Sequence, residues 1–148
     1  MTSFFPDVNV WLALSVSGHR HNAESWNWLN LLSRETRIMF SRYTQVGLLR
    51  LLTNQLVMGD QTLTVRKAWS VYDRWINDPR VEVYPEPRGI DAAFREAAAP
   101  FSNRPASKWI GDCYLLAYAK RNDAVLATFD QALYELAGKH GYSAVIPA

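Results

Sequence analysis

Short apolar runs alternate with helix-like segments along this chain, and this alternation limits the possible fold more than any other feature. We expect strands over residues 2–6, 36–41, 81–87, 124–129 and 142–146. These runs lack the polar face of a strand that is open to water on one side, so both of their faces are expected to be buried. Helices packed on both faces of a parallel sheet satisfy that pattern. The sequence therefore predicts a three-layer α/β/α sandwich with a central parallel sheet.

Helices are expected between these strands, where apolar residues recur at helical spacing. Their ranges are 8–15, 21–33, 44–54, 65–76, 90–99, 111–121 and 131–140. Thr44 is the expected N-cap of the helix that follows the second strand. Residues 55–64 contain a Gly-Asp turn signal, and residues 100–107 contain two prolines, so both segments are expected to be loops.

Length and composition favour one globular domain over residues 1–148. Nearly half of the residues are apolar (49%), which is enough for a full core. No apolar run is long enough to cross a bilayer, and the N-terminus lacks the basic region and cleavage site of a signal peptide. Cys113 is the only cysteine, so it cannot form an internal disulfide, and we expect it to pack in the core rather than act as a nucleophile. A cytoplasmic protein without membrane contact is expected.

The formal net charge of +2 is too small to indicate nucleic-acid binding on its own. The balance changes if three aspartates, Asp7, Asp112 and Asp130, belong to an internal site. The 16 basic residues then face 11 of the 14 acidic residues, which gives the remaining surface about +5. A surface of that charge suits a phosphate backbone better.

Three aspartates stand next to strongly apolar sequence, two of them at expected strand-to-helix junctions and one at the start of an expected helix. Asp7 follows the first strand, Asp130 follows the fourth, and Asp112 is expected in the first turn of the helix over 111–121. Ligands bind beyond the carboxyl ends of parallel strands, where such side chains meet. Each aspartate alone is equally well explained as a helix cap. Together, three carboxylates without a nearby histidine favour Mg²⁺ or Mn²⁺ over zinc, and we expect them to be catalytic metal ligands.

Several other polar or aromatic residues have two interpretations. Asn9 either orients a ligand or water or is simply a first-turn residue, and Arg50 either lies along the surface or contacts a phosphate. His19 and His21 are expected in a polar loop before a helix. Trp26 and Trp28 cannot face the same side of a helix, so one of the two is expected to be exposed for dimer contact or base stacking.

Four segments in order resemble PIN-domain ribonucleases, most closely toxins of VapC type. They are D-V-N-V-W-L-A-L (7–14), T-Q-V-G-L-L-R-L-L-T-N (44–54), K-W-I-G-D-C-Y-L-L-A-Y-A (108–119) and L-A-T-F-D (126–130). The resemblance implies a metal-dependent endoribonuclease with Asp7, Asp112 and Asp130 as its acidic site. It also implies cleavage of single-stranded or structured RNA and inhibition by a cognate antitoxin. A homodimer is expected as well.

The resemblance also places Asn9 and Thr128 beside the acids. The chain departs from the family at Gln45, where many PIN domains carry a glutamate. A neutral amide contributes no charge, which argues against a second metal ion. We expect Gln45 to lie near the site without being essential. Glu24, Asp91 and Glu96 are the alternatives for the missing acid.

Two other functions compete with this interpretation. D-V-N-V-W loosely matches the D-x-D-x-T start of haloacid-dehalogenase-type phosphohydrolases, but Asn9 and Trp11 replace the second aspartate and the threonine. A catalytically weak PIN-like module that binds RNA or protein is the other alternative, and Gln45 is the feature that favours it. The three aspartates argue against it, because a phosphate-binding module has no use for buried carboxylates.

Overall fold

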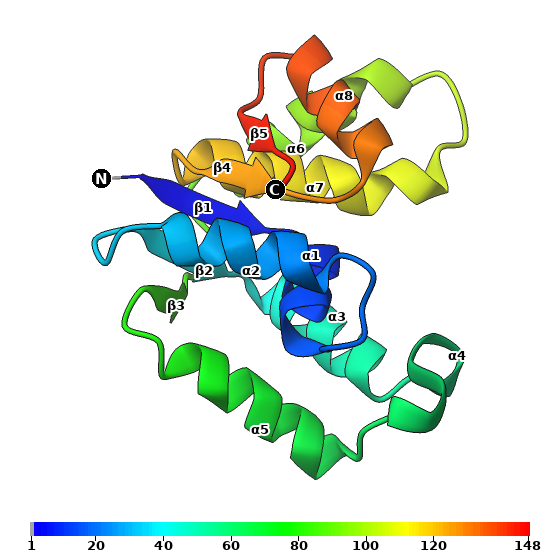
Figure 1. Ribbon diagram of the computed structural model, residues 1–148. Helices are drawn as coiled ribbons and strands as arrows, with labels where there is room; N and C mark the ends of the chain where they lie inside the picture. Colours follow the sequence, from blue (N-terminus) through cyan, green and yellow to red (C-terminus); the bar gives the residue numbers. More distant parts are fainter. Residues whose placement is uncertain (1) are drawn as a thin grey trace.

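A five-stranded parallel sheet forms the centre of the computed structural model, which describes residues 2–148 (Figure 1). The strands are β1 (Ser3–Pro6), β2 (Arg37–Phe40), β3 (Val81–Val83), β4 (Val125–Ala127) and β5 (Ala144–Val145). They lie in the order β3-β2-β1-β4-β5, and all four neighbouring pairs are parallel. The predicted parallel sheet and its five strands are confirmed.

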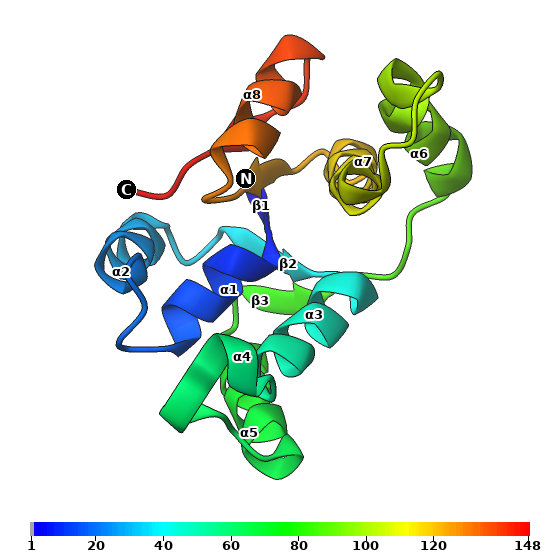
Figure 2. The ribbon, with the colours of Figure 1, turned by 90° about the vertical axis from the view of Figure 1, so that its right-hand side faces the viewer.

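Helices cover both faces of the sheet (Figures 1 and 2). One face carries α1 (Val8–Ser15), α2 (Asn22–Leu31), α3 (Arg42–Leu52) and α5 (Val65–Ile76). The opposite face carries α6 (Ile90–Ala98), α7 (Ser107–Arg121) and α8 (Gln131–Lys139). The fold is the predicted three-layer sandwich. No helix within residues 2–148 combines the length and the apolar character needed to span a bilayer.

The strand side chains alternate between two hydrophobic cores, one on each face. Phe5, Met39 and Leu126 pack against α7 and α8, and Cys113 is buried in this same core, as predicted. Phe40 faces the other way, where its ring stacks on Trp11 at a centroid distance of 3.9 Å. Both faces of the three central strands β2, β1 and β4 are therefore largely buried, which explains why these strands are apolar runs rather than alternating ones.

The start of α3 differs from the prediction, because Ser41 and not Thr44 is its N-cap. The Ser41 hydroxyl accepts a hydrogen bond from the Thr44 N–H (3.1 Å), and the Thr44 hydroxyl accepts one from the Ser41 N–H (3.0 Å). This reciprocal pair satisfies two N–H groups that the first helical turn leaves free. The helix therefore begins and ends two residues earlier than expected.

Two segments predicted as loops contain helix. Residues 55–58 form α4 (Gln55–Met58), which Asn54 caps, and a 3₁₀ turn follows (Gly59–Gln61). The helix α7 begins at Ser107 rather than Gly111, after a second 3₁₀ turn (Ala99–Phe101). Asp112 therefore lies in the second turn of α7 and not in the first, beyond the reach of the helix N-terminal partial charge.

Candidate functional site

The carboxyl ends of β1 and β4 meet at one edge of the sheet, and they bring Asp7 close to Thr128. The two strands pair in parallel, and the Asp7 N–H donates to the Ala127 carbonyl (2.8 Å). In the Asp7 carboxylate, Oδ1 accepts from the Val8 N–H (2.7 Å) and Oδ2 accepts from the Thr128 hydroxyl (2.8 Å). Asp7 is therefore held in one orientation by two donors.

Thr128 is the centre of a hydrogen-bond network that joins the two strand ends. Its fully buried hydroxyl also accepts from Asn9 Nδ2 (3.2 Å) and from the Asp130 N–H (3.0 Å). The other amide atom of Asn9, Oδ1, accepts from the Phe129 N–H (3.1 Å). Asn9 thus lies in the first turn of α1, and its side chain links α1 to the β4–α8 loop through two hydrogen bonds.

Asp7 and Asp112 line the same open cavity, of about 790 Å³. Arg50 of α3 also lines it, together with Tyr43 and Val46 on the same side of that helix. The guanidinium of Arg50, two carboxylates and the exposed apolar side chains of α3 therefore share one cavity at the edge of the sheet.

Two glycines let α3 approach the acidic edge closely. A Cβ on Gly47 would stand 2.7 Å from Cγ2 of Val8, the residue after Asp7. A Cβ on Gly111 would collide with the hydroxyl of Tyr43, beside Asp112. The helix that carries Arg50 is therefore placed against Asp7 and Asp112 by residues without side chains.

The pKa values of both cavity carboxyls are raised. For Asp7 the main cause is burial, which outweighs the opposing hydrogen bonds from Thr128 and Val8. Burial is also the first cause of the raised pKa of Asp112, about 6, and the charges of Asp7 and Asp130 add to it. Lys108 acts in the opposite direction on the Asp112 pKa. Two carboxyl groups with raised pKa values in one cavity favour a positively charged ligand. Such a ligand would offset both the cost of burying the carboxylate charges and the repulsion between them.

Comparison with known proteins identifies the family. The model of the PIN domain matches residues 4–139. This chain belongs to the PIN-domain family. It is 40% identical over 136 residues to Ribonuclease VapC41 of Mycobacterium tuberculosis, across 89% of this chain and 92% of that protein.

Solved structures show the same fold at low sequence identity. VapBC2 from Rickettsia felis, bound to a DNA fragment from its promoter, superposes with a TM-score of 0.73 at 13% identity, over 99% of this chain and 100% of that one. VapC20 of Mycobacterium tuberculosis, a toxin that cleaves the sarcin–ricin loop, gives 0.68 at 16%, over 97% and 99%. Membership of the PIN-domain family over residues 4–139 rules out the haloacid-dehalogenase alternative. Asn9, at the position of its general acid, is instead engaged with Thr128 and Phe129.

PIN-domain ribonucleases generally depend on a divalent metal ion. The cavity of this PIN domain supplies two of the three predicted carboxylate ligands for such an ion, Asp7 and Asp112. Within residues 2–148, no three side chains of the types His, Cys, Asp and Glu are gathered closely enough to enclose a metal ion. The exposed Asp130 does not line the cavity, and its carboxylate caps α8 by accepting from the Leu133 N–H (3.1 Å). Mg²⁺ typically binds through one or two carboxylates and keeps several waters. Asp7 and Asp112 fit that arrangement.

Gln45 lies on a different side of α3 from the cavity. Its buried side-chain oxygen accepts a hydrogen bond from the Arg42 guanidinium, and it is not among the cavity residues. The three alternatives for the missing acid are also paired elsewhere. Glu24 bonds His21, Asp91 pairs with Arg95, and Glu96 lies near Lys120.

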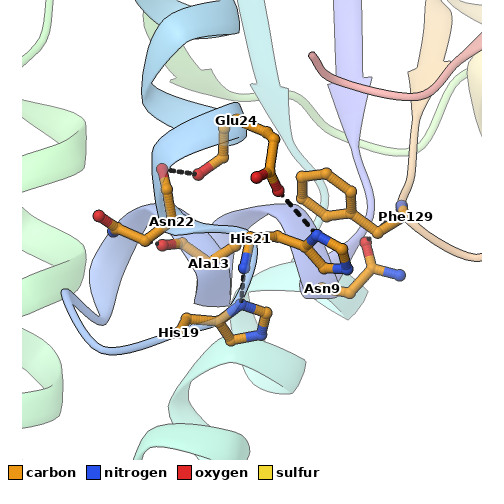
Figure 3. A network of polar contacts seen from close by, with 8 residues as sticks. Asn9, Ala13, His19, His21, Asn22, Glu24 and Phe129 are labelled. Atoms are coloured by element: carbon orange, nitrogen blue, oxygen red, sulfur yellow. Dashed lines mark hydrogen bonds and ion pairs between the residues drawn. The ribbon is translucent and has the colours of Figure 1, made fainter.

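The sequence did not predict one contact beside the site, between His21 and Phe129. The two rings are stacked with their centroids 4.4 Å apart and their planes inclined by only 9° (Figure 3). No local signal reveals a contact between residues so distant in the sequence. Trp26 and Trp28 behave as expected, because Trp26 is 38% exposed and Trp28 is buried.

Proposed function

We propose that this PIN domain is a metal-dependent endoribonuclease and the toxin of a toxin–antitoxin module. The observation that carries the proposal is the cavity in which Asp7 and Asp112 face Arg50. Two carboxylates for a cation and one guanidinium for a phosphate are the groups that cleavage of a phosphodiester needs. The similarity to VapC41 and VapC20, a ribonuclease and an RNA-cleaving toxin, supports the same activity.

Each polar residue of the site has a role in this proposal. Asp7 and Asp112 would hold Mg²⁺ or Mn²⁺. Asp130, which lies in the neighbouring β4–α8 loop, would position a water. A cation bound there would lower the pKa of a water and offset charge on a phosphoryl oxygen. The hydrogen bonds of Asn9 and Thr128 fix the position of Asp7 relative to the loop that carries Asp130.

Arg50 is the residue we assign to the substrate. Its side chain is exposed in the cavity, so it can reach a phosphate of a bound RNA strand. The exposed ring of Tyr43 lies in the same cavity, next to Gly111. We therefore expect RNA to follow the α3 side of the cavity, with the scissile phosphate near Asp112.

Cleavage of a defined RNA tests the proposal. The parent should cut with Mg²⁺ or Mn²⁺ and stop when EDTA is added. Asp112→Asn should lose more than the about 10- to 100-fold that outer partners of a metal ligand typically cost. Asp91→Asn is the matched control, because Asp91 is an exposed aspartate paired with Arg95 on α6. Equal rates for Asp112→Asn and the parent would show that the cavity carboxylates are not the catalytic site.

The alternative of a PIN-like module that binds without cleaving makes the opposite prediction. Such a protein would retain RNA in a filter-binding measurement but would give no cleavage with either metal. The position of Asp7 and Asp112 in one cavity favours the enzyme, because a cavity that only binds phosphate gains nothing from two negative charges.

An antitoxin is the protein partner we infer, because several structural neighbours are toxin–antitoxin complexes. The planar guanidinium of an arginine binds carboxylates bidentately, so an antitoxin arginine could occupy the place of the metal between Asp7 and Asp112. A co-purified complex should then be inactive and should regain activity when the antitoxin is removed. A complex with full ribonuclease activity would contradict this mode of inhibition.

We also propose a homodimer that works in the cytoplasm. Trp26, with 38% of its surface exposed, is a candidate for dimer contact. Light scattering after size-exclusion chromatography should give twice the mass of 16.9 kDa. A monomer at micromolar concentration would contradict the dimer and leave the cleavage chemistry unchanged.

A further inference from the structure

His21 and Glu24 form a polar pair at the start of α2, directly beside the β4–α8 loop. His21 Nδ1 lies 2.8 Å from Glu24 Oε2, and the backbone N–H of His21 donates to Nδ1 of His19 (3.0 Å). One face of the His21 ring covers Phe129 (Figure 3). The imidazole is therefore oriented by Glu24 and stacks on an aromatic ring, while the backbone N–H of the same residue is held by His19.

The backbone that carries His21 is itself anchored. Asn22 Nδ2 donates to the Ala13 carbonyl of α1 (2.8 Å), and the Ser25 hydroxyl donates to the Asn22 carbonyl (2.8 Å). The start of α2 is thus attached to α1 (Figure 3). Because α1 begins directly after Asp7, the pair and the acidic edge share one rigid support.

Phe129 connects this pair to the candidate metal site. It stands between Thr128 and Asp130, and its N–H donates to Asn9 Oδ1 (3.1 Å). Asn9 in turn bonds the Thr128 hydroxyl, which donates to Asp7 (2.8 Å). A continuous series of contacts therefore runs from Glu24 to the Asp7 carboxylate.

We propose that His21 and Glu24 are positioning residues, which clamp Phe129 and thereby hold the β4–α8 loop where Thr128 orients the metal ligand Asp7. This inference rests on the proposed function. Neither residue lines the cavity that holds Asp7 and Asp112, so we assign neither of them a contact with the metal ion. The clamp acts through Phe129 on its two neighbours, Thr128 and Asp130, which orient Asp7 and position water.

A purely stabilising role fits the pair less well. The side chains of His21 and Glu24 are 30% and 46% exposed, and partly exposed ion pairs contribute little to global stability. Metal binding is more sensitive, because the groups behind a ligand fix its orientation. The clamp should therefore affect metal affinity more than the melting temperature.

Calorimetric titration with Mn²⁺ tests the clamp on the full chain. We expect His21→Ala to weaken Mn²⁺ binding about 3- to 10-fold, which is less than the direct partners of a metal ligand typically cost. The melting temperature of the metal-free protein should change little. His21→Phe should keep more of the parent's affinity than His21→Ala, because a flat ring still covers Phe129 although the contact with Glu24 is lost. His140→Ala is the matched control, since His140 is an exposed histidine at the end of α8.

A double-mutant cycle locates the effect. Asn9→Ala releases the same loop from the other side, so His21→Ala and Asn9→Ala should combine non-additively in Mn²⁺ affinity. Additive effects would overturn the proposed route through Phe129. Equal weakening by His21→Phe and His21→Ala would also overturn it, because stacking would then not be the cause.

Failure of the clamp is distinguishable from failure of the enzyme. If the parent binds Mn²⁺ and cuts RNA while His21→Ala has the same affinity, only the clamp is wrong. If the parent neither binds Mn²⁺ nor cuts RNA, both the proposed function and the clamp are wrong.

Discussion

The hydroxyl of Thr128 donates a hydrogen bond of 2.8 Å to the carboxylate of Asp7, which lies 121 residues away in the sequence. The same oxygen accepts from Asn9 Nδ2 and from the Asp130 N–H. One donor and two acceptor positions are all that a hydroxyl offers, so this side chain is fully used. It therefore joins the two strand ends that carry the acidic residues.

Thr128→Val should destabilise the protein and slow cleavage. Valine has a similar shape but leaves the Asn9 amide and the Asp130 N–H without their buried acceptor, which typically costs about 1–3 kcal/mol per group. The loss of the donated hydrogen bond should also raise the pKa of Asp7 further. Urea unfolding and the cleavage rate measure the two effects. Thr128→Ser keeps the hydroxyl and should stay close to the parent; an equally large loss in both variants would assign the effect to packing.

Asp112 should make the metal-free protein less stable as the pH rises. Its pKa is raised from 3.8 to about 6 in the folded protein. Below pH 3.8 both states hold the proton, so there is no penalty. Between the two pKa values the folded state keeps a proton that the unfolded chain has lost, and stability falls until about pH 7.

Urea unfolding in EDTA from pH 4 to pH 8 measures this dependence. The parent should lose stability across that range relative to Asp112→Asn, which cannot ionise there. Asp7 remains in both proteins, so the difference between the two curves isolates Asp112. Parallel curves would mean that the Asp112 carboxyl titrates as it does in water.

Gly47→Ala should destabilise the contact between α3 and α1. The new methyl group would stand 2.7 Å from Cγ2 of Val8, whose β-branched side chain has little rotamer freedom in a helix. Overpacking of this kind typically costs about 1–3 kcal/mol. The double variant Val8→Ala with Gly47→Ala should recover stability, because the colliding methyl group is gone. Urea unfolding of all four proteins gives the coupling, and no recovery would show that the backbone, not Val8, resists the methyl group.

Gln45→Ala should reduce stability more than cleavage, because Gln45 is buried on the core side of α3 and bonds Arg42. Asp112→Ala should do the reverse. Cleavage rates and unfolding free energies of both variants test this contrast. An equal loss of cleavage in the two variants would assign the amide a direct role at the metal.

The layers of the fold could be predicted from the sequence because strand burial leaves a local signal. Phe5, Met39 and Phe40 belong to runs that are apolar on both faces, and such runs occur where helices cover both sides of a sheet. Helix boundaries were less predictable. Ser41 and Thr44 are both good caps, and only the backbone decides that Ser41 is the cap.

The sequence pointed to three aspartates but not to their arrangement, in which Asp7 and Asp112 line one cavity and Asp130 does not. Asp7 and Asp130 follow strands that turned out to be neighbours, so their meeting at one edge follows from the parallel topology. The position of Asp112 depends on where α7 begins, and the two prolines before Ser107 suggested a later start. The stacking of His21 on Phe129 depends on tertiary packing, which leaves no periodic signal in the sequence.

Thermal melting with and without Mn²⁺ at pH 7 tests most directly whether Asp7 and Asp112 bind a divalent cation. A ligand present at 100 times its dissociation constant stabilises the folded state by about 2.7 kcal/mol. We predict that Mn²⁺ raises the melting temperature of the parent and of Asp91→Asn, and raises that of Asp112→Asn much less. An equal rise in all three proteins, or in none, would contradict a metal site at the two cavity aspartates.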